Sequence, residues 1–223
     1  MPKPADPGNA QAETEHARLV ESVRRLIEAA VTVQAPPAVL GAAADAIDRV
    51  IGELRPHVPS PPPPRYPTAM TAPDPASLMP YDPIMGRLSP LAPPVRFAWQ
   101  DPKAIGRVSF TKPYEGPPGC VHGGVIASVF DQVFNVANVM RGVAGPTKQL
   151  EVRFRRPTPL GVAVAFEGWQ ERVEGREIHA AGRLLAGGEV CVEAQGCFAQ
   201  VPVERIMRLL ERDPGGDPTG GSR

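Results

Sequence analysis

Hydrophobic and polar residues alternate with two different periods along this chain, and the change of period divides it into parts. Between residues 14 and 33, and again between residues 38 and 54, apolar residues recur every three or four positions. That spacing predicts two amphipathic helices, and the pair Pro36-Pro37 separates them. We therefore expect a helical hairpin over residues 14–55. It is too small to build its own core, so its apolar face should dock on another surface.

From Val95 onward the period changes to two, which is typical of strands. The predicted strands cover residues 95–99, 104–110, 147–156, 162–173, 177–185 and 189–201. Short turns such as Gly187-Gly188 join the later strands and leave no room for the crossover helices that a parallel sheet requires. The pattern favours an α+β domain over residues 95–203, with an antiparallel sheet.

One helix is predicted inside that domain. The stretch Gly119 to Arg141 reads GCVHGGVIASVFDQVFNVANVMR and is apolar on almost every side, which marks a buried helix around which the sheet wraps. Polar residues at helical spacing form one narrow stripe on it: Ser128, Asp131, Asn135 and Asn138. Asp131 is the only charge between His122 and Met140. Such a carboxylate must be hydrogen-bonded, face a water-filled pocket, or be a functional group with a shifted pKa.

Proline dominates the segment between the hairpin and the sheet, where 14 of the 39 residues from 56 to 94 are proline. This density excludes regular helices and central strands, so we expect a semi-rigid linker. From Tyr81 the composition is more varied, and this part is expected to cover an edge of the following domain. Residues 1–13 should be disordered, and residues 204–223 form a C-terminal tail.

Composition narrows the choice of partners. The chain has 24 basic and 24 acidic residues, so no overall field favours nucleic acid. No apolar run is long enough to span a bilayer, and the first residues lack a signal-peptide core. The three cysteines form neither an even disulfide set nor a CxxC pattern, and no two of the four histidines have zinc-ligand spacing. We therefore expect reduced thiols, a cytoplasmic location, no metal and no cofactor.

Several motifs together resemble one known family. They are His122-Gly123-Gly124, Asp131 nine positions after the histidine, Thr147, the run RPTPLG at 156–161, and VEGR at 173–176. In this combination and spacing they resemble the hotdog-fold acyl-CoA thioesterases of the PaaI/THEM4-like group, over about residues 81–203. The hairpin and most of the proline-rich linker lie outside the resemblance.

The resemblance implies hydrolysis of acyl-CoA thioesters by a homodimer or homotetramer with its sites at a subunit interface. It assigns the catalytic carboxylate to Asp131 and the oxyanion-binding turn to His122, Gly123 and Gly124, and Thr147 matches a residue implicated across the interface. The expected substrate contacts are Arg153, Arg155, Arg176 and Asn135. Relatives often have Glu after the catalytic Asp, whereas this chain has Gln132.

Elementary chemistry agrees with this assignment. Amides at a helix N-terminus are free to bind a developing oxyanion, and glycines let a thioester carbonyl approach them. Asp131 lies about 10 Å further along the same helix, which is too far for one compact site. A second subunit whose helix presents Asp131 to the first subunit's diglycine turn solves this problem. Asp131 then acts as general base on water or attacks directly to form a mixed anhydride, and the sequence leaves both open.

Three other functions also remain open. Cys120 and His122 could form a nucleophile–base pair, because positions i and i+2 of an extended segment point the same way. The domain could instead bind acyl-CoA or lipid without turnover. A hotdog dehydratase, with His122 as catalytic histidine, is the third. The length of the acyl chain and the choice between dimer and tetramer are not determined by the sequence.

Overall fold

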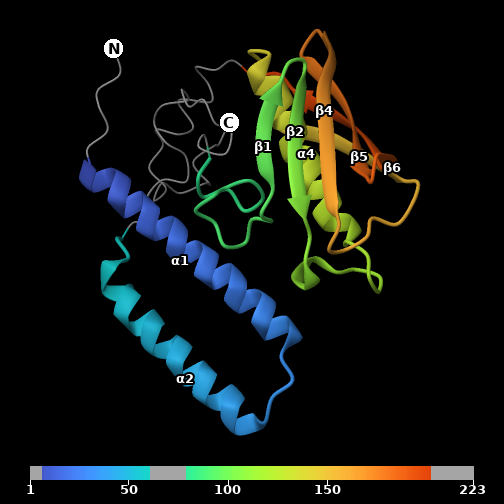
Figure 1. Cartoon of the computed structure of the whole chain (residues 1–223). Coiled ribbons are helices and arrows are strands. Elements are labelled where there is room, and N and C mark those ends of the chain that lie inside the picture. Colours follow the sequence, from blue (N-terminus) through green and yellow to red (C-terminus); the bar gives the residue numbers. More distant parts are fainter. Residues whose placement is uncertain (1–6, 61–78, 202–223) are drawn as a thin grey trace, which may run out of the picture.

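A six-stranded antiparallel sheet wraps around one long helix. The computed structural model describes residues 7–60 and 79–201, and the strand order in the sheet is β1-β2-β4-β5-β6-β3 (Figure 1). The strands are β1 (Arg96–Gln100), β2 (Lys103–Ser109), β3 (Thr147–Phe154), β4 (Ala163–Glu174), β5 (Glu177–Ala186) and β6 (Glu189–Ala199). The helix is α4 (Gly123–Met140). The predicted strands, the buried helix and the antiparallel pairing are confirmed.

The core lies between α4 and the concave face of the sheet, and aromatic rings fill it. Phe130 and Phe134 of α4 are 0% exposed, and their rings lie 5.1 Å from Phe166 and 6.3 Å from Phe198 respectively, between ring centroids. Three glycines on neighbouring strands let α4 come this close. A Cβ would lie within 3.0 Å of Val133 or Phe134 at Gly168, Gly182 and Gly196. Because small residues on three strands face one large ring, the helix settles at one depth in the sheet.

The last part of the proline-rich segment belongs to the folded domain. Met85, Leu88 and Ala92 are buried, and the buried carboxylate of Asp82 accepts hydrogen bonds from the N–H groups of Ile84 and Met85. The expectation that this part covers the following domain is therefore confirmed. The run Pro61 to Pro64 lies outside the described residues, as do residues 1–6 and the expected tail, 204–223.

Two helices precede the domain. Helix α1 spans Pro7–Thr32 and α2 spans Pro37–Leu54. The first begins seven residues before the expected start at Thr14, so residues 7–13, expected to be disordered, are helical. Alanine, glutamine and glutamate in this segment are good helix formers, and proline is well tolerated in the first helical turn.

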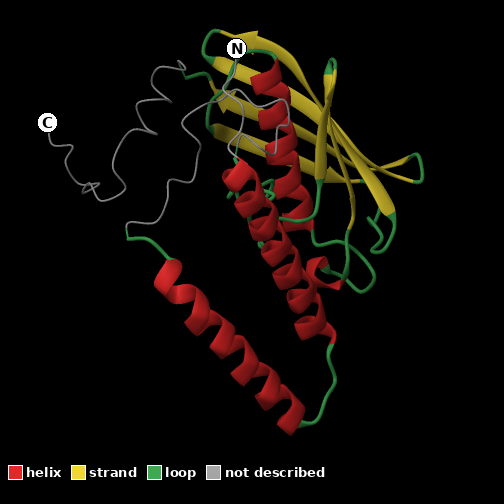
Figure 2. Ribbon diagram, turned by 60° about the vertical axis from the view of Figure 1, so that its left-hand side comes forward, coloured by secondary structure: helices red, strands yellow, loops and turns green. Residues whose placement is uncertain are grey.

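Only α1 docks on the domain. Val20 is 3% exposed, and the guanidinium of Arg24 donates to the carbonyl oxygen of Ser89 over 2.8 Å. Helix α2 has no buried residue, and α1 lies between it and the sheet (Figures 1 and 2). Helix α1 thus docks on the domain as expected, while docking of the apolar face of α2 stays a prediction. In the part of the chain that the structure describes, no helix is long and apolar enough to cross a membrane.

Candidate active site

The diglycine turn forms the N-terminus of α4. His122 is the N-cap residue, and its Nδ1 accepts a hydrogen bond of 3.0 Å from the N–H of Gly124. The preceding loop fixes this geometry, since the N–H of His122 donates to Tyr114 and that of Val121 to Thr158, each over 2.8 Å to the carbonyl oxygen. Gly123 is the first residue of the helix, so its N–H has no acceptor inside the helix. The N–H of Gly123 is therefore open to a ligand, whereas the N–H of Gly124 is hydrogen-bonded to His122.

An aromatic ring from β3 lies against this turn. A Cβ on Gly123 would be 3.0 Å from Cζ of Phe154, so only glycine leaves the present contact undisturbed. Phe154 is 55% exposed although it is large and apolar. The sequence shows Phe154 only as one residue of an alternating strand and gives no sign of this contact. Its exposed ring therefore lies next to Gly123, at the start of α4.

Asp131 lies two turns further along α4, and a residue of the sheet donates a hydrogen bond to it. The hydroxyl of Thr147, the first residue of β3, donates to Oδ1 over 2.6 Å, and the amide of Asn135 donates to Oδ2 at the long distance of 3.5 Å. Burial raises the pKa of Asp131 above its ordinary value. The hydrogen bond from Thr147 opposes this rise, and the nearby charge of Asp82 adds to it. A partly buried carboxylate that is protonated more easily than usual is suited to accept a proton.

Of the two remaining residues of the polar stripe, one bonds through its side chain to the backbone of α4, and the other has no side-chain hydrogen-bond partner among the described residues. The hydroxyl of Ser128 donates to the carbonyl oxygen of Gly124 over 2.8 Å. Asn138 is 1% exposed, and neither its side-chain oxygen nor its nitrogen has a hydrogen-bond partner within the described ranges. Gln132, at the position where relatives often have glutamate, is only partly buried. Asp131 is the only stripe residue that combines a charge, a donor from the sheet and partial access to solvent.

The three arginines expected to contact substrate differ from one another. Arg153 pairs with Glu151 and Arg155 with Glu193, both at 2.7 Å. Arg176 is exposed in the turn between β4 and β5, and it has no carboxylate partner among residues 7–60 and 79–201. Strand register places Arg176 at the same end of the sheet as Thr147, because the neighbouring Glu177 pairs with Ala199 and Thr147 with Phe198. Arg176 is thus the arginine most available to an anionic ligand near Asp131.

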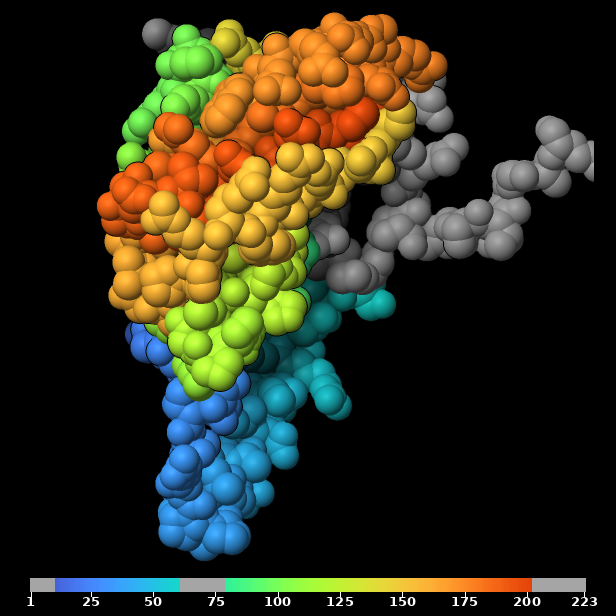
Figure 3. All heavy atoms as spheres, turned by 90° about the vertical axis from the view of Figure 1, so that its right-hand side faces the viewer, coloured from blue at the N-terminus to red at the C-terminus, as the bar shows by residue number. Residues whose placement is uncertain are grey.

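Within one chain, Asp131 and the diglycine turn lie at opposite ends of β3. Thr147, at one end, contacts Asp131, while Phe154, at the other end, contacts Gly123. Among the described residues, strand β3 is the last strand of the sheet and pairs only with β6. In Figure 3 the amber residues of β3 lie at the surface, between the red residues of β6 and the lime ones around the start of α4. A strand edge therefore runs from the vicinity of Asp131 to that of the diglycine turn.

Two other groups of reactive side chains lie in the described part of the domain. No hydrogen bond joins the thiol of Cys120 to His122 in the described part of the chain, and Nδ1 of His122 is used in the helix cap. Glu177, His179 and Cys197 are brought together by β5 and β6 and are the one group among the described residues able to hold a metal ion. They lie on the face of the sheet opposite α4, away from Asp131.

Comparisons with known proteins identify the family. The family model described as thioesterase superfamily matches residues 118–193, which contain both the diglycine turn and Asp131. A crystal structure of a thioesterase superfamily protein is 34% identical, with a TM-score of 0.74, and the match covers 82% of this chain and 94% of that one. The chain belongs to the thioesterase superfamily. Its fold is the hotdog fold, as the sequence motifs led us to expect.

The match to this crystal structure extends beyond the hotdog domain. Because it covers 82% of the chain, it includes residues from the N-terminal helices as well. Two curated relatives match a shorter part. Acyl-coenzyme A thioesterase THEM4 of Xenopus laevis is 39% identical over 67 residues, and that of Mus musculus is 29% identical over 95 residues. These matches cover 30% and 42% of this chain, and 30% and 41% of the relatives' own length.

Proposed function

We propose that this protein hydrolyses acyl-CoA thioesters to a free acid and CoA, at a site shared by two subunits. The curated relatives named above are acyl-coenzyme A thioesterases, and their similarity covers 30–42% of this chain. The observation that carries the proposal is Asp131, a partly buried carboxylate that Thr147 holds next to the free edge of the sheet.

A second subunit at the free edge of β3 would complete the site. If two copies of β3 pair in antiparallel fashion about a twofold axis midway between Leu150 and Glu151, Thr147 lies opposite the partner's Phe154. Because Thr147 contacts Asp131 and Phe154 contacts Gly123, this pairing brings Asp131 of one chain to the partner's diglycine turn. It would also cover an otherwise unpaired strand edge and the exposed ring of Phe154.

The proposed chemistry follows from this arrangement. The thioester carbonyl oxygen points at the N-terminus of α4, where the N–H of Gly123 and the helix dipole stabilise the negative charge that develops. The exposed ring of His122 turns away when substrate arrives and releases the N–H of Gly124 as a second donor. Asp131 takes a proton from the attacking water or attacks the carbonyl itself. Arg176 contacts a CoA phosphate, and Asn135 orients the carboxylate of Asp131.

The decisive experiment is hydrolysis of acyl-CoA by Asp131→Asn, with the released CoA measured by a thiol reagent. Asparagine keeps the shape of the side chain but cannot accept the proton, so kcat/KM should fall by about 100-fold or more. Asp48→Asn, an exposed residue on α2, is the matched control and should keep full activity. Full activity in Asp131→Asn, with the fold and the dimer intact, would refute the assignment.

The two mechanistic routes are separated by a single turnover in water enriched in oxygen-18. Label in the side chain of Asp131 identifies the mixed anhydride, because water that attacks the Asp131 carbonyl leaves its oxygen there, whereas a general base gains no solvent oxygen. Attack at the acyl carbon puts the label in the released acid by either route.

One observation supports a second candidate function, binding of acyl-CoA without turnover. In this conformation the N–H of Gly124 donates a hydrogen bond to Nδ1 of His122, so only the N–H of Gly123 is open. A protein that keeps this contact with ligand bound would hold the thioester and hydrolyse it poorly. Substrate that binds stoichiometrically but releases no CoA over many hours would favour this function over hydrolysis.

A further inference from the structure

Three side chains with different ligand atoms meet on the outer face of the sheet. Glu177 and His179 are two residues apart on β5, and Cys197 lies directly opposite His179 on β6. Their neighbours in sequence, such as Ile178 and Phe198, are buried in the core. Because side chains alternate along a strand, the cluster faces away from α4 and from Asp131.

His179 has an imidazole nitrogen without a partner. Its Nε2 is inaccessible to solvent and makes no hydrogen bond within the described ranges. Two carboxylate oxygens flank it, Oε2 of Glu177 at 3.8 Å and Oε2 of Glu174 at 3.9 Å. These separations are too long for hydrogen bonds. They are close to about 3.3–3.6 Å, which is the distance between neighbouring ligand atoms when each lies about 2.0–2.2 Å from a tetrahedral zinc ion.

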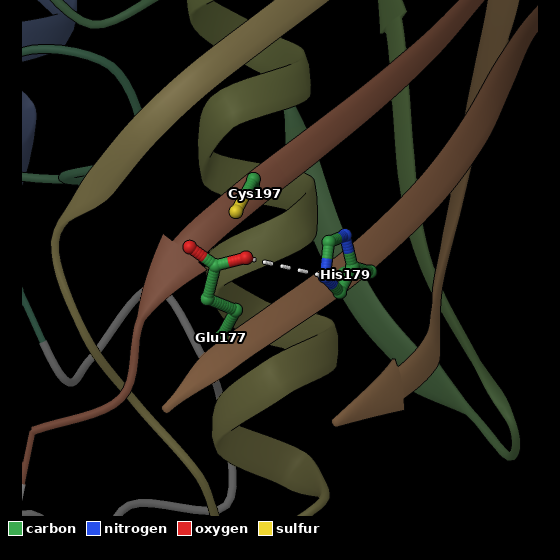
Figure 4. Close-up of side chains that lie close together, drawn as sticks. All are labelled: Glu177, His179 and Cys197. Atoms are coloured by element: carbon green, nitrogen blue, oxygen red, sulfur yellow. Dashed lines mark ion pairs between the residues drawn. The ribbon is translucent and has the colours of Figure 1, made fainter. Parts of the chain in front are cut away.

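Both carboxylates are held through their other oxygen. Lys148 donates to Oε1 of Glu177, and Nε of Arg172 donates to Oε1 of Glu174 over 2.8 Å. Each pairing leaves Oε2 turned toward His179. Figure 4 shows one oxygen of Glu177 pointing at His179 and the other pointing away, with the thiol of Cys197 beside the carboxylate. Carboxylates that bind metals are commonly oriented by a hydrogen bond of this kind.

We propose that these residues form a binding site for zinc or a similar divalent transition metal. Nε2 of His179, Sγ of Cys197 and Oε2 of Glu177 are the ligands, and one atom of each lies within 4.8 Å of the others. Water completes the coordination, because Oε2 of Glu174, although 3.9 Å from Nε2 of His179, does not belong to this group. A mixed set of thiolate, imidazole and carboxylate suits zinc, whereas calcium and magnesium prefer oxygen alone. The metal displaces the thiol proton to solvent and links the β4–β5 turn to β6.

Such a site follows from the sheet and not from sequence spacing. His179 and Cys197 are far apart along the chain, and only the register of β5 on β6 puts them opposite each other. The proposal does not depend on the thioesterase assignment, because none of its residues touches Asp131 or the diglycine turn. A metal here would act on stability by binding only the folded chain.

The test uses the full chain, freed of metal by a chelator and then titrated with Co²⁺ and Zn²⁺. We expect one equivalent of Co²⁺ to give an intense near-ultraviolet thiolate-to-cobalt band, which Zn²⁺ abolishes by displacement. Cys197→Ser should remove the band, and His179→Gln should weaken Zn²⁺ affinity by about 100-fold or more, since even outer partners of a metal ligand contribute about 10- to 100-fold. Zn²⁺ should raise Tm of the wild-type chain and not of His179→Gln.

Cys120→Ser and His57→Gln are the matched controls, because they change the same residue types outside the cluster, and both should bind metal as the wild type does. Tm measured with chelator present verifies that each variant is folded. The proposal is overturned if no thiolate band forms. It is also overturned if the band survives Cys197→Ser and is lost in Cys120→Ser, or if Zn²⁺ affinity is the same in His179→Gln as in the wild type.

Discussion

The hydrogen bond from Thr147 to Asp131 opposes the larger effect of burial on the pKa of this carboxylate. Burial raises the pKa of Asp131, and the 2.6 Å bond from Thr147 opposes the rise because it favours the charged form. Thr147→Val replaces the hydroxyl by a methyl group of the same shape and suits a strand. The pKa of Asp131 should therefore rise further. If Asp131 must be charged to work, the acid limb of the kcat/KM profile moves to higher pH.

The size of the shift follows from the strength of the bond. A hydrogen bond to a charged group contributes about 1.5–3 kcal/mol, and one pKa unit corresponds to about 1.4 kcal/mol. Loss of the bond can therefore raise the pKa of Asp131 by at most about 1–2 units. Thr147 is exposed, and water can replace part of what its hydroxyl provides. We therefore expect an upward shift of about 0.5–1 pH unit.

The assay is acyl-CoA hydrolysis at low substrate concentration between pH 4 and pH 9, about the range in which carboxylates and histidines titrate. Thr147→Ser keeps the hydroxyl and is the control, so its acid limb should coincide with that of the wild type. If the hydroxyl of Thr147 only contacted substrate, its removal would lower the rate equally at every pH. An acid limb of Thr147→Val that stays in place, or moves to lower pH, would refute the reasoning.

The remaining predictions concern stability and assembly. Phe134→Ala, at a fully buried ring, should lower the free energy of unfolding by about 3–5 kcal/mol in a urea titration, whereas Leu91→Ala, at a side chain 72% exposed, should change it little. Val20→Lys places a charge at the buried contact of α1, so limited proteolysis should cut α1 much faster while the hotdog domain stays intact. Phe154→Lys at the free edge of β3 should shift the protein from dimer to monomer in analytical ultracentrifugation and lower hydrolysis with it, and activity in a stable monomer would contradict the shared site.

Local patterns were sufficient for most of the hotdog domain. Alternation over residues 147–156 predicts β3, and an all-round apolar stretch after His122 predicts α4, because burial on one face or on every face leaves its period in the chain. The same reasoning misses the start of α1, since the polar residues 7–13 show no apolar period although they favour helix. It also cannot tell that α1 would dock on the domain while α2 has no buried residue.

The sequence by itself determined which residues are chemically exceptional: a lone carboxylate on a buried helix and a diglycine turn at its start. Only the tertiary structure decided their neighbours, because contacts between strands depend on register and not on distance along the chain. Register puts Thr147 against Asp131, Phe154 against Gly123, and Cys197 opposite His179. None of these pairs has a spacing that marks it in the sequence. The free edge of β3 is likewise a property of the whole sheet, since it exists only because β3 is its last strand.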